Sequence, residues 1–305
     1  MKKLLAILLA GLMVFSIAAC SNKEKQETND DEKYRDNTVI VDSATHGSDT
    51  FRFENVDSET VIVAGFSTTL DKAHEVKIPA YFMVPGNERE QEPDKYLRVV
   101  GVGKEAFLNS SSISALTFPT EEDYKVHDAD FDMSEHTFSI GDYAFRECVS
   151  LQSLTLPAYV SEVGVGAFYG CVALNTLTFA EGSLLTEIKD YAFMNCISLK
   201  TVEFPATVEN IGVAAFFECV ALETVIINEG TLTVGAQAFQ KCAALAELKL
   251  PASLEAIGKY AFHTCNALYK EGLTYAGNSA AINAYISSLA LTERPVEEPA
   301  ETPAE

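Results

Sequence analysis

Six of the seven cysteines are the residues best suited to covalent chemistry, and all six occupy one position of a recurring pattern. Each stands three residues after a phenylalanine; they are Cys148, Cys171, Cys196, Cys219, Cys242 and Cys265. A reactive thiol needs an electropositive, partly exposed site, which a position shared by every repeat does not provide. We interpret them as a ladder of small, buried apolar groups. Disulfides between neighbours are the alternative, because stacked strands bring equivalent residues within disulfide range.

The five histidines offer no recognisable catalytic or metal-binding spacing. They are His46, His74, His127, His136 and His263. None stands in H-E-x-x-H, and the chain lacks a G-x-S-x-G elbow, a phosphate loop and a C-x-x-C pair. His263 lies close to Cys265, but the other repeats hold very different residues at its position, which indicates a solvent-facing one. Those residues are Arg146, Tyr169, Met194, Phe217 and Gln240. We therefore predict that the protein is not an enzyme and holds no cofactor.

An acidic segment at 120–136 interrupts the repeats. Its seven acidic residues are Glu121, Glu122, Asp123, Asp128, Asp130, Asp132 and Glu135. Asp128, Asp130 and Asp132 alternate as at the start of a calcium loop, but the required Gly at the sixth position and Glu at the twelfth are missing. We expect a solvated acidic loop, and insertions into repeats often lie on the binding face. Metal binding by the three aspartates is the alternative.

A pattern that returns about every 23 residues positions all these groups. Ala-Phe pairs stand at 106–107, 144–145, 167–168, 192–193, 215–216, 238–239 and 261–262. A fixed period of this length is the mark of a solenoid. In each repeat a glycine permits a turn, about one helical turn points Ala and Phe inward, and an L-x-L strand such as 154–156 follows. Stacked strands would form a parallel sheet along one side. The repeat that reaches Phe193 is two residues longer and has Lys189 in place of the glycine.

Alternate residues of the strands should point away from the core and form two parallel columns. These candidate binding residues are Ser153, Thr155, Thr176, Thr178, Thr201, Glu203, Thr224, Ile226, Glu247 and Lys249, preceded by Ala115 and Thr117. A stiff, extended sheet offers a platform for a macromolecule. The alternative is that threonine is simply a good exposed strand residue. Tyr169 and Phe217 form a second candidate patch, because aromatic residues are favoured at interface hot spots.

The N-terminus predicts export. Lys2 and Lys3 precede an apolar stretch at 4–17 that is too short for a membrane span. The run Ser16-Ile17-Ala18-Ala19-Cys20 resembles the lipobox of bacterial lipoproteins. This resemblance implies that residues 1–19 are removed as a signal peptide and that Cys20 carries a lipid; an ordinary cleavage site is the alternative. Residues 20–36 are almost devoid of apolar side chains and predict a disordered tether.

The charge of the protein limits its partners. The 305-residue chain has a formal net charge of −22, which becomes −24 without Lys2 and Lys3. Nucleic acid binding needs clustered Lys and Arg, so no nucleic acid partner is expected. The folded domain is equally unsuited to an anionic bilayer, which leaves the lipid on Cys20 as the membrane contact. The expected partner is a protein or another extracellular macromolecule.

Beyond the tether we expect four segments: an N-terminal β cap, the solenoid, a C-terminal capping helix and a disordered acidic tail. In that order they span 37–97, 98–275, 276–290 and 291–305. Short strands at 51–53, 61–63 and 76–79 support the β cap. Apolar residues at helical spacing support the capping helix; they are Ile282, Tyr285, Ile286 and Leu289.

The combined pattern Ile-Gly-x-x-Ala-Phe-x-x-Cys-x-x-Leu-x-x-Leu-x-Leu-Pro resembles the BspA-like leucine-rich repeats of bacterial surface proteins, from residue 98 to about 273. The resemblance implies a leucine-rich repeat solenoid with a parallel sheet on one side and short helical turns. It also implies a lipid-anchored, surface-exposed envelope protein that adheres to host or partner-cell macromolecules. Two alternatives remain: a structural scaffold that assembles other surface proteins, and an envelope enzyme whose site lies in 37–136, where the unrepeated His and acidic residues are.

Overall fold

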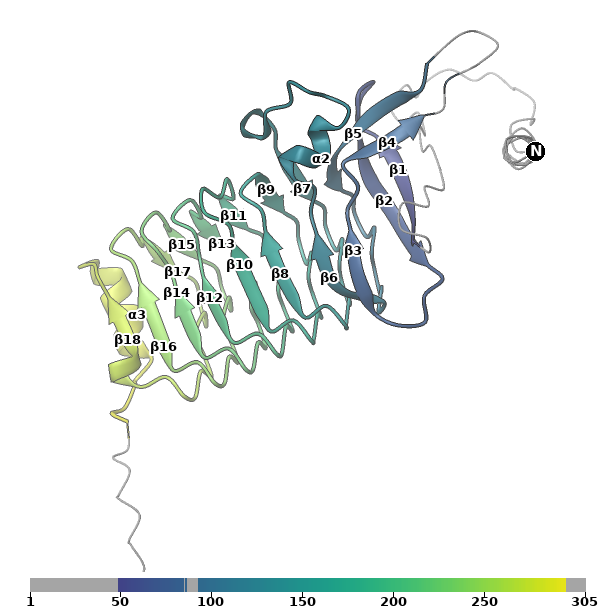
Figure 1. Cartoon of the computed structure of the whole chain (residues 1–305). Coiled ribbons are helices and arrows are strands. Elements are labelled where there is room, and N and C mark those ends of the chain that lie inside the picture. Colours follow the sequence, from purple (N-terminus) through teal and green to yellow (C-terminus); the bar gives the residue numbers. More distant parts are fainter. Residues whose placement is uncertain (1–48, 85, 87–92, 295–305) are drawn as a thin grey trace, which may run out of the picture. The chain divides into compact units, whose positions relative to one another are not determined.

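The computed structural model describes residues 49–84, 86 and 93–294 (Figure 1). The predicted signal peptide, Cys20 and the predicted tether lie outside the described residues, as do residues 37–48 of the predicted cap and 295–305 of the predicted tail. Within the described ranges, no helix is both long and apolar enough to cross a membrane. The described residues belong to one compact unit.

The predicted parallel sheet is present and is built from the L-x-L segments, one per coil (Figure 1). Its strands are β6 (Ile113–Thr117), β8 (Ser153–Leu156), β10 (Thr176–Phe179), β12 (Thr201–Glu203), β14 (Thr224–Ile226), β16 (Glu247–Leu250) and β18 (Leu273–Tyr275). An eighth strand, β3 (His74–Lys77), joins from outside the repeats. They form two four-stranded sheets, in the orders β10-β8-β6-β3 and β12-β14-β16-β18. We call the outward surface of these eight strands the strand face.

A second sheet, which we call the long sheet, is built from the apolar residues that precede each glycine. Its repeat strands are β7 (Phe138–Ile140), β9 (Val160–Val163), β11 (Glu187–Ile188), β13 (Asn210–Ile211), β15 (Thr233–Val234) and β17 (Ala256–Ile257). They pair in parallel because equivalent segments of successive coils run in the same direction. A β-branched residue recurs in the same register; Ile188, for example, pairs with Val163 on one side and Ile211 on the other. Each coil therefore contributes two strands rather than the single one expected.

The segment after each glycine is a series of tight turns rather than a continuous helix. Tyr143 and Glu147 adopt left-handed backbone angles, with φ of 55° and 58°. Between them, Phe145 donates its N–H to Ala167 O in the next coil at 2.8 Å, and Tyr143 donates to Val165 O at the same distance. A Cβ on Gly141 would lie 2.8 Å from the backbone of Gly103 and Lys104. The glycine is therefore required by the close approach of neighbouring coils.

Side chains that repeat from coil to coil fill the core. The repeated Ala, Phe, Cys and Leu are buried throughout the solenoid. The phenylalanine rings stack in a column, with centroids of Phe145 and Phe168 5.2 Å apart and interplanar angle 5°. Each stacked aromatic pair contributes about 1 kcal/mol beyond the area it buries. The column sets the thickness of every coil, and therefore the separation between the strands of the strand face and those of the long sheet.

The N-terminal strands extend the long sheet beyond the first coil. They are β1 (Asp49–Asn55), β2 (Thr60–Thr68), β4 (Tyr81–Val84) and β5 (Lys95–Val102). β1 and β4 pair antiparallel to their neighbours β2 and β5. The ring of Phe66 stacks on Phe107, the first phenylalanine of the column, at 4.9 Å. β1 and β2 contain two of the expected strands, β3 includes only the first two residues of the third, and β4 was not predicted.

At the C-terminal end, helix α3 (Ala280–Ser288) is shorter than the predicted 276–290. Ser279 begins it by accepting the N–H of Ile282 on its side chain. Tyr285 accepts the N–H of Phe262 on its hydroxyl at 3.1 Å. In every preceding coil a backbone carbonyl of the following coil takes this N–H. The tyrosine hydroxyl thus replaces the carbonyl that the missing next coil would have supplied.

Candidate functional site

The repeated cysteines are buried free thiols, which confirms the ladder interpretation. Each Sγ–H donates to a phenylalanine carbonyl of the preceding coil; the Sγ–O distance is 3.2 Å from Cys171 to Phe145 and 3.3 Å from Cys219 to Phe193. Burial raises the pKa of Cys148, Cys219 and Cys265 to about 12. Thiols with such pKa values remain protonated at neutral pH and are poor nucleophiles. The six repeated cysteines therefore contribute to core packing and are not candidates for nucleophilic catalysis.

Two histidines of the region 37–136, His127 and His136, stack on aromatic rings. His127 stacks on Tyr96, with centroids 3.6 Å apart, and His136 stacks on Phe131 at 4.5 Å while its Nε2 lies 3.1 Å from Arg98. His263 is exposed beside Gln240, as its repeat position predicted. Among the described residues, no group of three His, Cys, Asp or Glu side chains could hold a metal ion.

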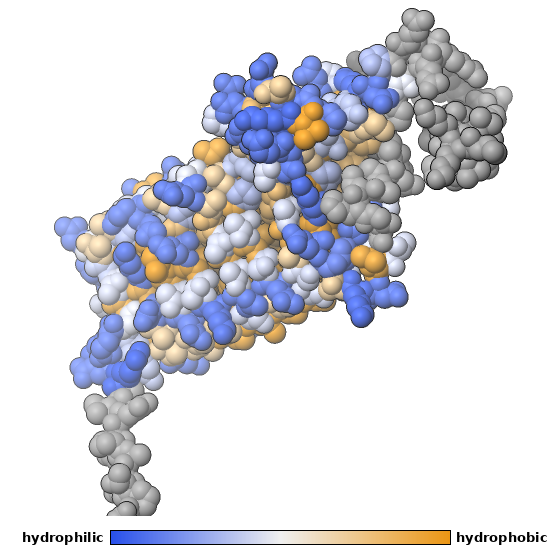
Figure 2. All heavy atoms as spheres, in the orientation of Figure 1, coloured by the Kyte–Doolittle hydropathy of each residue, from blue (hydrophilic) through white to orange (hydrophobic). Residues whose placement is uncertain are grey.

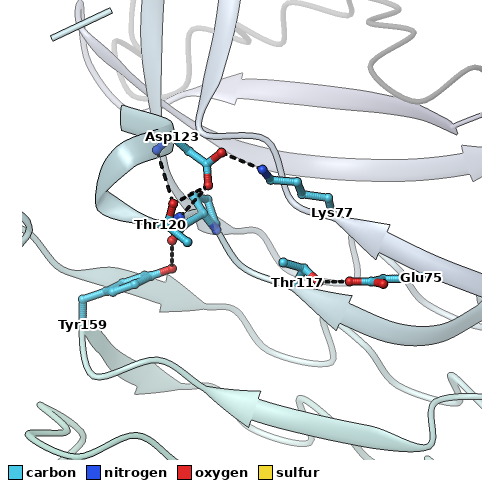
Figure 3. Close-up of polar contacts among 7 residues, drawn as sticks. Glu75, Lys77, Thr117, Thr120, Asp123 and Tyr159 are labelled. Atoms are coloured by element: carbon cyan, nitrogen blue, oxygen red, sulfur yellow. Dashed lines mark hydrogen bonds and ion pairs between the residues drawn. The ribbon is translucent and has the colours of Figure 1, made fainter. Parts of the chain in front are cut away.

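The acidic segment 120–136 is more ordered than the expected solvated loop. It contains helix α2 (Glu121–Lys125) and the 3-10 helix η1 (Met133–Glu135). Thr120 and Asp123 cap each other's backbone N–H groups at the start of α2, and Asp123 pairs with Lys77 of β3 at 2.6 Å (Figure 3). Hydrogen bonds to its oxygens lower the pKa of Asp123 although burial opposes them. The pattern T-x-x-D was the sequence signal for this cap.

Two aromatic residues anchor this segment. Tyr124 and Phe131 are buried with Ala80, and the Tyr124 hydroxyl donates to Val99 O of β5 at 2.7 Å. Asp132, one of the metal candidates, accepts hydrogen bonds from both the backbone and the hydroxyl of Ser134. These Ser134 bonds lower the pKa of Asp132. The prediction of a loop was therefore wrong, because the segment is partly helical and carries its own apolar anchors, although none of its acidic side chains is buried.

The candidate binding residues of the strands lie together on the strand face, in the predicted two columns. Parallel register places Thr176 beside Ser153 and Thr178 beside Thr155, whose hydroxyls lie 2.9 Å apart. Across the second sheet the neighbours are Thr201, Thr224 and Glu247 in one column, and Glu203, Ile226 and Lys249 in the other. Figure 2 shows white residues, of near-neutral hydropathy, across the middle of this face. Thr224 and Ile226 are half-buried, and the other eight are exposed.

Strand β3 lengthens both columns by residues that sequence reasoning missed. Glu75 pairs with Ala115 and Lys77 with Thr117, and the hydroxyl of Thr117 donates to the carboxylate of Glu75 (Figure 3). At the other end Thr274 lies beside Lys249. β3 precedes the repeats, so only its alternation of polar and apolar residues could have indicated a place in this sheet.

Tyr169 and Phe217, the second candidate patch, lie on separate coils. They are half-buried at equivalent positions two coils apart, with Met194 on the coil between them. The guanidinium of Arg146 lies 5.1 Å from the ring centroid of Tyr169, and Lys241 Nζ lies 4.9 Å from that of Phe217. Each ring therefore already has a cation on one face, in a pairing that contributes about 0.5–1 kcal/mol at exposed sites.

Two depressions mark the strand face. The first, of about 580 Å³, lies between β10 and β12, which are not joined in one sheet. Five of the candidate residues line it: Thr178, Thr201, Glu203, Thr224 and Ile226. The second, of about 560 Å³, lies over β14, β16 and β18 and includes Glu247, Lys249 and Arg294. The sequence analysis did not identify Phe179, Glu181 and Asn228, which also line the first depression. The repeat that is two residues longer was the sequence feature that could have indicated this irregularity.

Comparison with known proteins places the coils in a family. The model of the BspA type leucine rich repeat region matches in 6 copies, at residues 124–186, 138–269 and 186–294. These matches together cover more than half of the chain. Proteins with these repeats are typically binding proteins of bacterial surfaces. The comparison with curated proteins finds no match.

Two solved structures of bacterial leucine-rich repeat proteins are similar to this chain. A leucine rich repeat protein of T. pallidum is 21% identical, with 80% of this chain and 95% of that chain covered and a TM-score of 0.45. A leucine-rich repeat protein of Eubacterium ventriosum is 20% identical, with 73% and 51% covered and a TM-score of 0.52. With its tandem 23-residue coils and the matching family model, this chain belongs to the BspA-type leucine-rich repeat family.

Proposed function

We propose that the protein is an exported, lipid-anchored binding protein whose strand face docks an extracellular macromolecule without catalysis. The observation that carries the proposal is the gathering of the two columns on one surface, eight strands wide, with two depressions in it. Among the described residues, no group of three His, Cys, Asp or Glu side chains could hold a metal ion, and the repeated cysteines are buried.

The chemistry of the strand face suits a large partner. Small-molecule sites are usually enclosed and mostly apolar, whereas this surface is broad and carries hydroxyls with a few charges. A specific macromolecular interface buries about 800 Å² on each partner, which requires residues from several neighbouring coils. The rigid hydrogen-bonded ladders keep those residues in place before binding, so little order has to be gained when the partner arrives.

The test is a binding screen of residues 21–305, the mature chain without the predicted lipid-bearing Cys20, against matrix proteins, envelope polymers and whole cells. The informative variant is Thr155→Arg with Thr178→Arg, which places two bulky charges at the centre of the strand face. The matched control is Asn210→Arg with Thr233→Arg, because this pair is also joined across coils by a side-chain hydrogen bond but belongs to the long sheet.

The strand-face variant should weaken binding by about tenfold or more, as expected for a residue pair at an interface centre. The control should bind as the unmodified chain does. Equal losses in both variants, or no saturable partner in any class, would count against the proposal. Crosslinking in the native cell addresses the scaffold alternative, because a scaffold would yield endogenous surface proteins as the main products.

The anchor is tested separately. Replacing Cys20 by Ser removes the only acceptor that the lipobox resemblance provides. The variant should leave the membrane fraction and lose incorporation of labelled fatty acid, since stable attachment depends on the acyl chains. A control substitution, Ser21→Ala, should remain with the membrane. Retention of label by the Cys20→Ser variant would contradict the lipid anchor while leaving the binding surface untouched.

A further inference from the structure

The depression between β10 and β12 originates in a local change of the repeat. Equivalent residues of neighbouring strands are 23 positions apart elsewhere on this part of the face, but Thr176 and Thr201 are 25 apart. The additional residues lie in the connection that follows β10, where Gly182 turns with a φ of 74°. No backbone hydrogen bond joins β10 to β12 in the described structure, whereas β12 and β14 are joined in regular register.

The walls of this depression combine negative charge with apolar surface. Among the described residues that line it, Glu181 and Glu203 are the only charged ones, and none is Lys, Arg or His. Neither glutamate forms an ion pair with another described residue. Phe179, Pro205 and Ile226 supply half-buried apolar surface beside them. The second depression differs, because Lys249 and Arg294 balance its carboxylates.

One of the two glutamates is held in position. Asn228 donates its Nδ2 to Glu203 Oε1 at 3.2 Å and to the backbone carbonyl of Phe204 at 2.9 Å. This amide bridge orients one carboxylate oxygen, and the other accepts no hydrogen bond from the described residues. The hydroxyls of Thr178, Thr201 and Thr224 surround it with further hydrogen-bonding groups.

We propose that this depression receives a Lys or Arg side chain from a basic segment of the macromolecular partner. The aliphatic stem of such a residue would lie along Phe179 and Ile226, as long charged side chains do on apolar surfaces. Its cationic head would reach the free oxygen of Glu203, and an Arg could form the stronger two-point contact. The chain's net charge of −22 would attract a basic partner to the protein. The inference rests on the proposed function and specifies its partner as a basic polypeptide.

The experiment titrates the mature chain with a fluorescent peptide of alternating Arg and Ser, at low and at physiological salt. Two control peptides replace Arg by citrulline, which keeps the shape without the charge, or by Glu. The key variant is Glu181→Gln with Glu203→Gln. Its matched control is Glu187→Gln with Glu255→Gln, which removes the same two charges from exposed positions at the long sheet.

We expect saturable binding of the Arg peptide, weakened about tenfold by the depression variant and less than about twofold by the control. Citrulline and Glu peptides should not saturate. Equal weakening by both variants would overturn the inference, because binding would then follow net charge only. Failure of the Arg peptide to bind would also overturn it. If the Thr155→Arg, Thr178→Arg variant still loses a partner found in the screen, the proposed function stands and only the basic-segment inference fails.

Discussion

The chain departs from its period at two places, and the two departures have opposite consequences. The long one, 120–136, folds into α2 and η1 and buries Tyr124 and Phe131 against the N-terminal strands. The short one adds two residues before β11 and leaves β10 and β12 unpaired around a depression. The length of an insertion therefore does not measure its effect on the surface. A long segment can satisfy its own apolar and polar groups, whereas two residues suffice to interrupt a ladder.

The largest effect is expected where the long departure is anchored. Phe131→Ala removes a buried ring and should lower the free energy of unfolding by about 3 kcal/mol, as large-to-small core substitutions do. Glu181→Ala, in the short departure, should change it by less than about 0.5 kcal/mol, since its exposed side chain has no ion-pair partner. Urea unfolding of both variants measures the difference. Similar values for the two would mean that the long segment is not anchored by its aromatic residues.

A smaller, pH-dependent effect is expected at the cap of α2. The pKa of Asp123 is lowered in the folded protein, so its ionised carboxylate stabilises the fold at neutral pH. This stabilisation is lost as the pH falls below about 4, the ordinary pKa of an Asp, and through the lowered pKa of the folded state. Asp123→Asn should therefore cost about 1 kcal/mol at pH 7. The cost should shrink as the pH falls. Urea unfolding at pH 7 and pH 3 checks this.

Glu122→Gln is the control for that measurement, because the neighbouring Glu122 side chain is 85% exposed and caps nothing. It should be nearly neutral at both pH values. A pH-independent cost for Asp123→Asn would mean that the side chain acts by shape alone and that its ion pair with Lys77 contributes nothing.

The smallest effect concerns single amide groups at the short departure. Lys200 precedes β12 at the position that Asn175 and Glu223 occupy in neighbouring coils. Those two donate their N–H groups to Gln152 O and Lys200 O, at 2.9 and 2.8 Å. The N–H of Lys200 has no such partner among the described residues. Its hydrogen exchange should be about tenfold faster or more. Equal protection of all three amides would show that the ladder is closed in solution.

Much of the fold could be predicted because the pattern is local and repeated. The spacing of Phe145 and Cys148 recurs six times, so one interpretation of a coil accounts for all of them. The outward positions of the strands followed from alternation within L-x-L. The second sheet was missed because its strands are as short as two residues, such as Glu187–Ile188, which is too short for alternation to be recognised. Strand β4 was missed because Tyr81–Val84 has no repeat partner.

The candidate site was predicted only in part. Ten outward residues were identified, yet Glu181 and Asn228 were not, because neither belongs to a strand. The choice of Tyr169 and Phe217 rested on residue type, and could not include the cations of Arg146 and Lys241 that lie over their rings. Arg146 and Lys241 lie beside these rings because adjacent coils stack and the chain makes left-handed turns. The spacing of residues along the sequence does not reveal such contacts.

By itself, the sequence determined the solenoid, its buried columns of Phe, Cys and Leu, and the direction in which the strand residues point. Identical residues at a constant interval can stack in only one register, so those features follow from periodicity. Only the tertiary structure decided what the irregular residues do. Tyr124 donates a hydrogen bond to Val99, and β10 remains unpaired with β12, the strand that contains Glu203. These outcomes depend on contacts between segments that share no period, and the geometry of the assembled coils settles them.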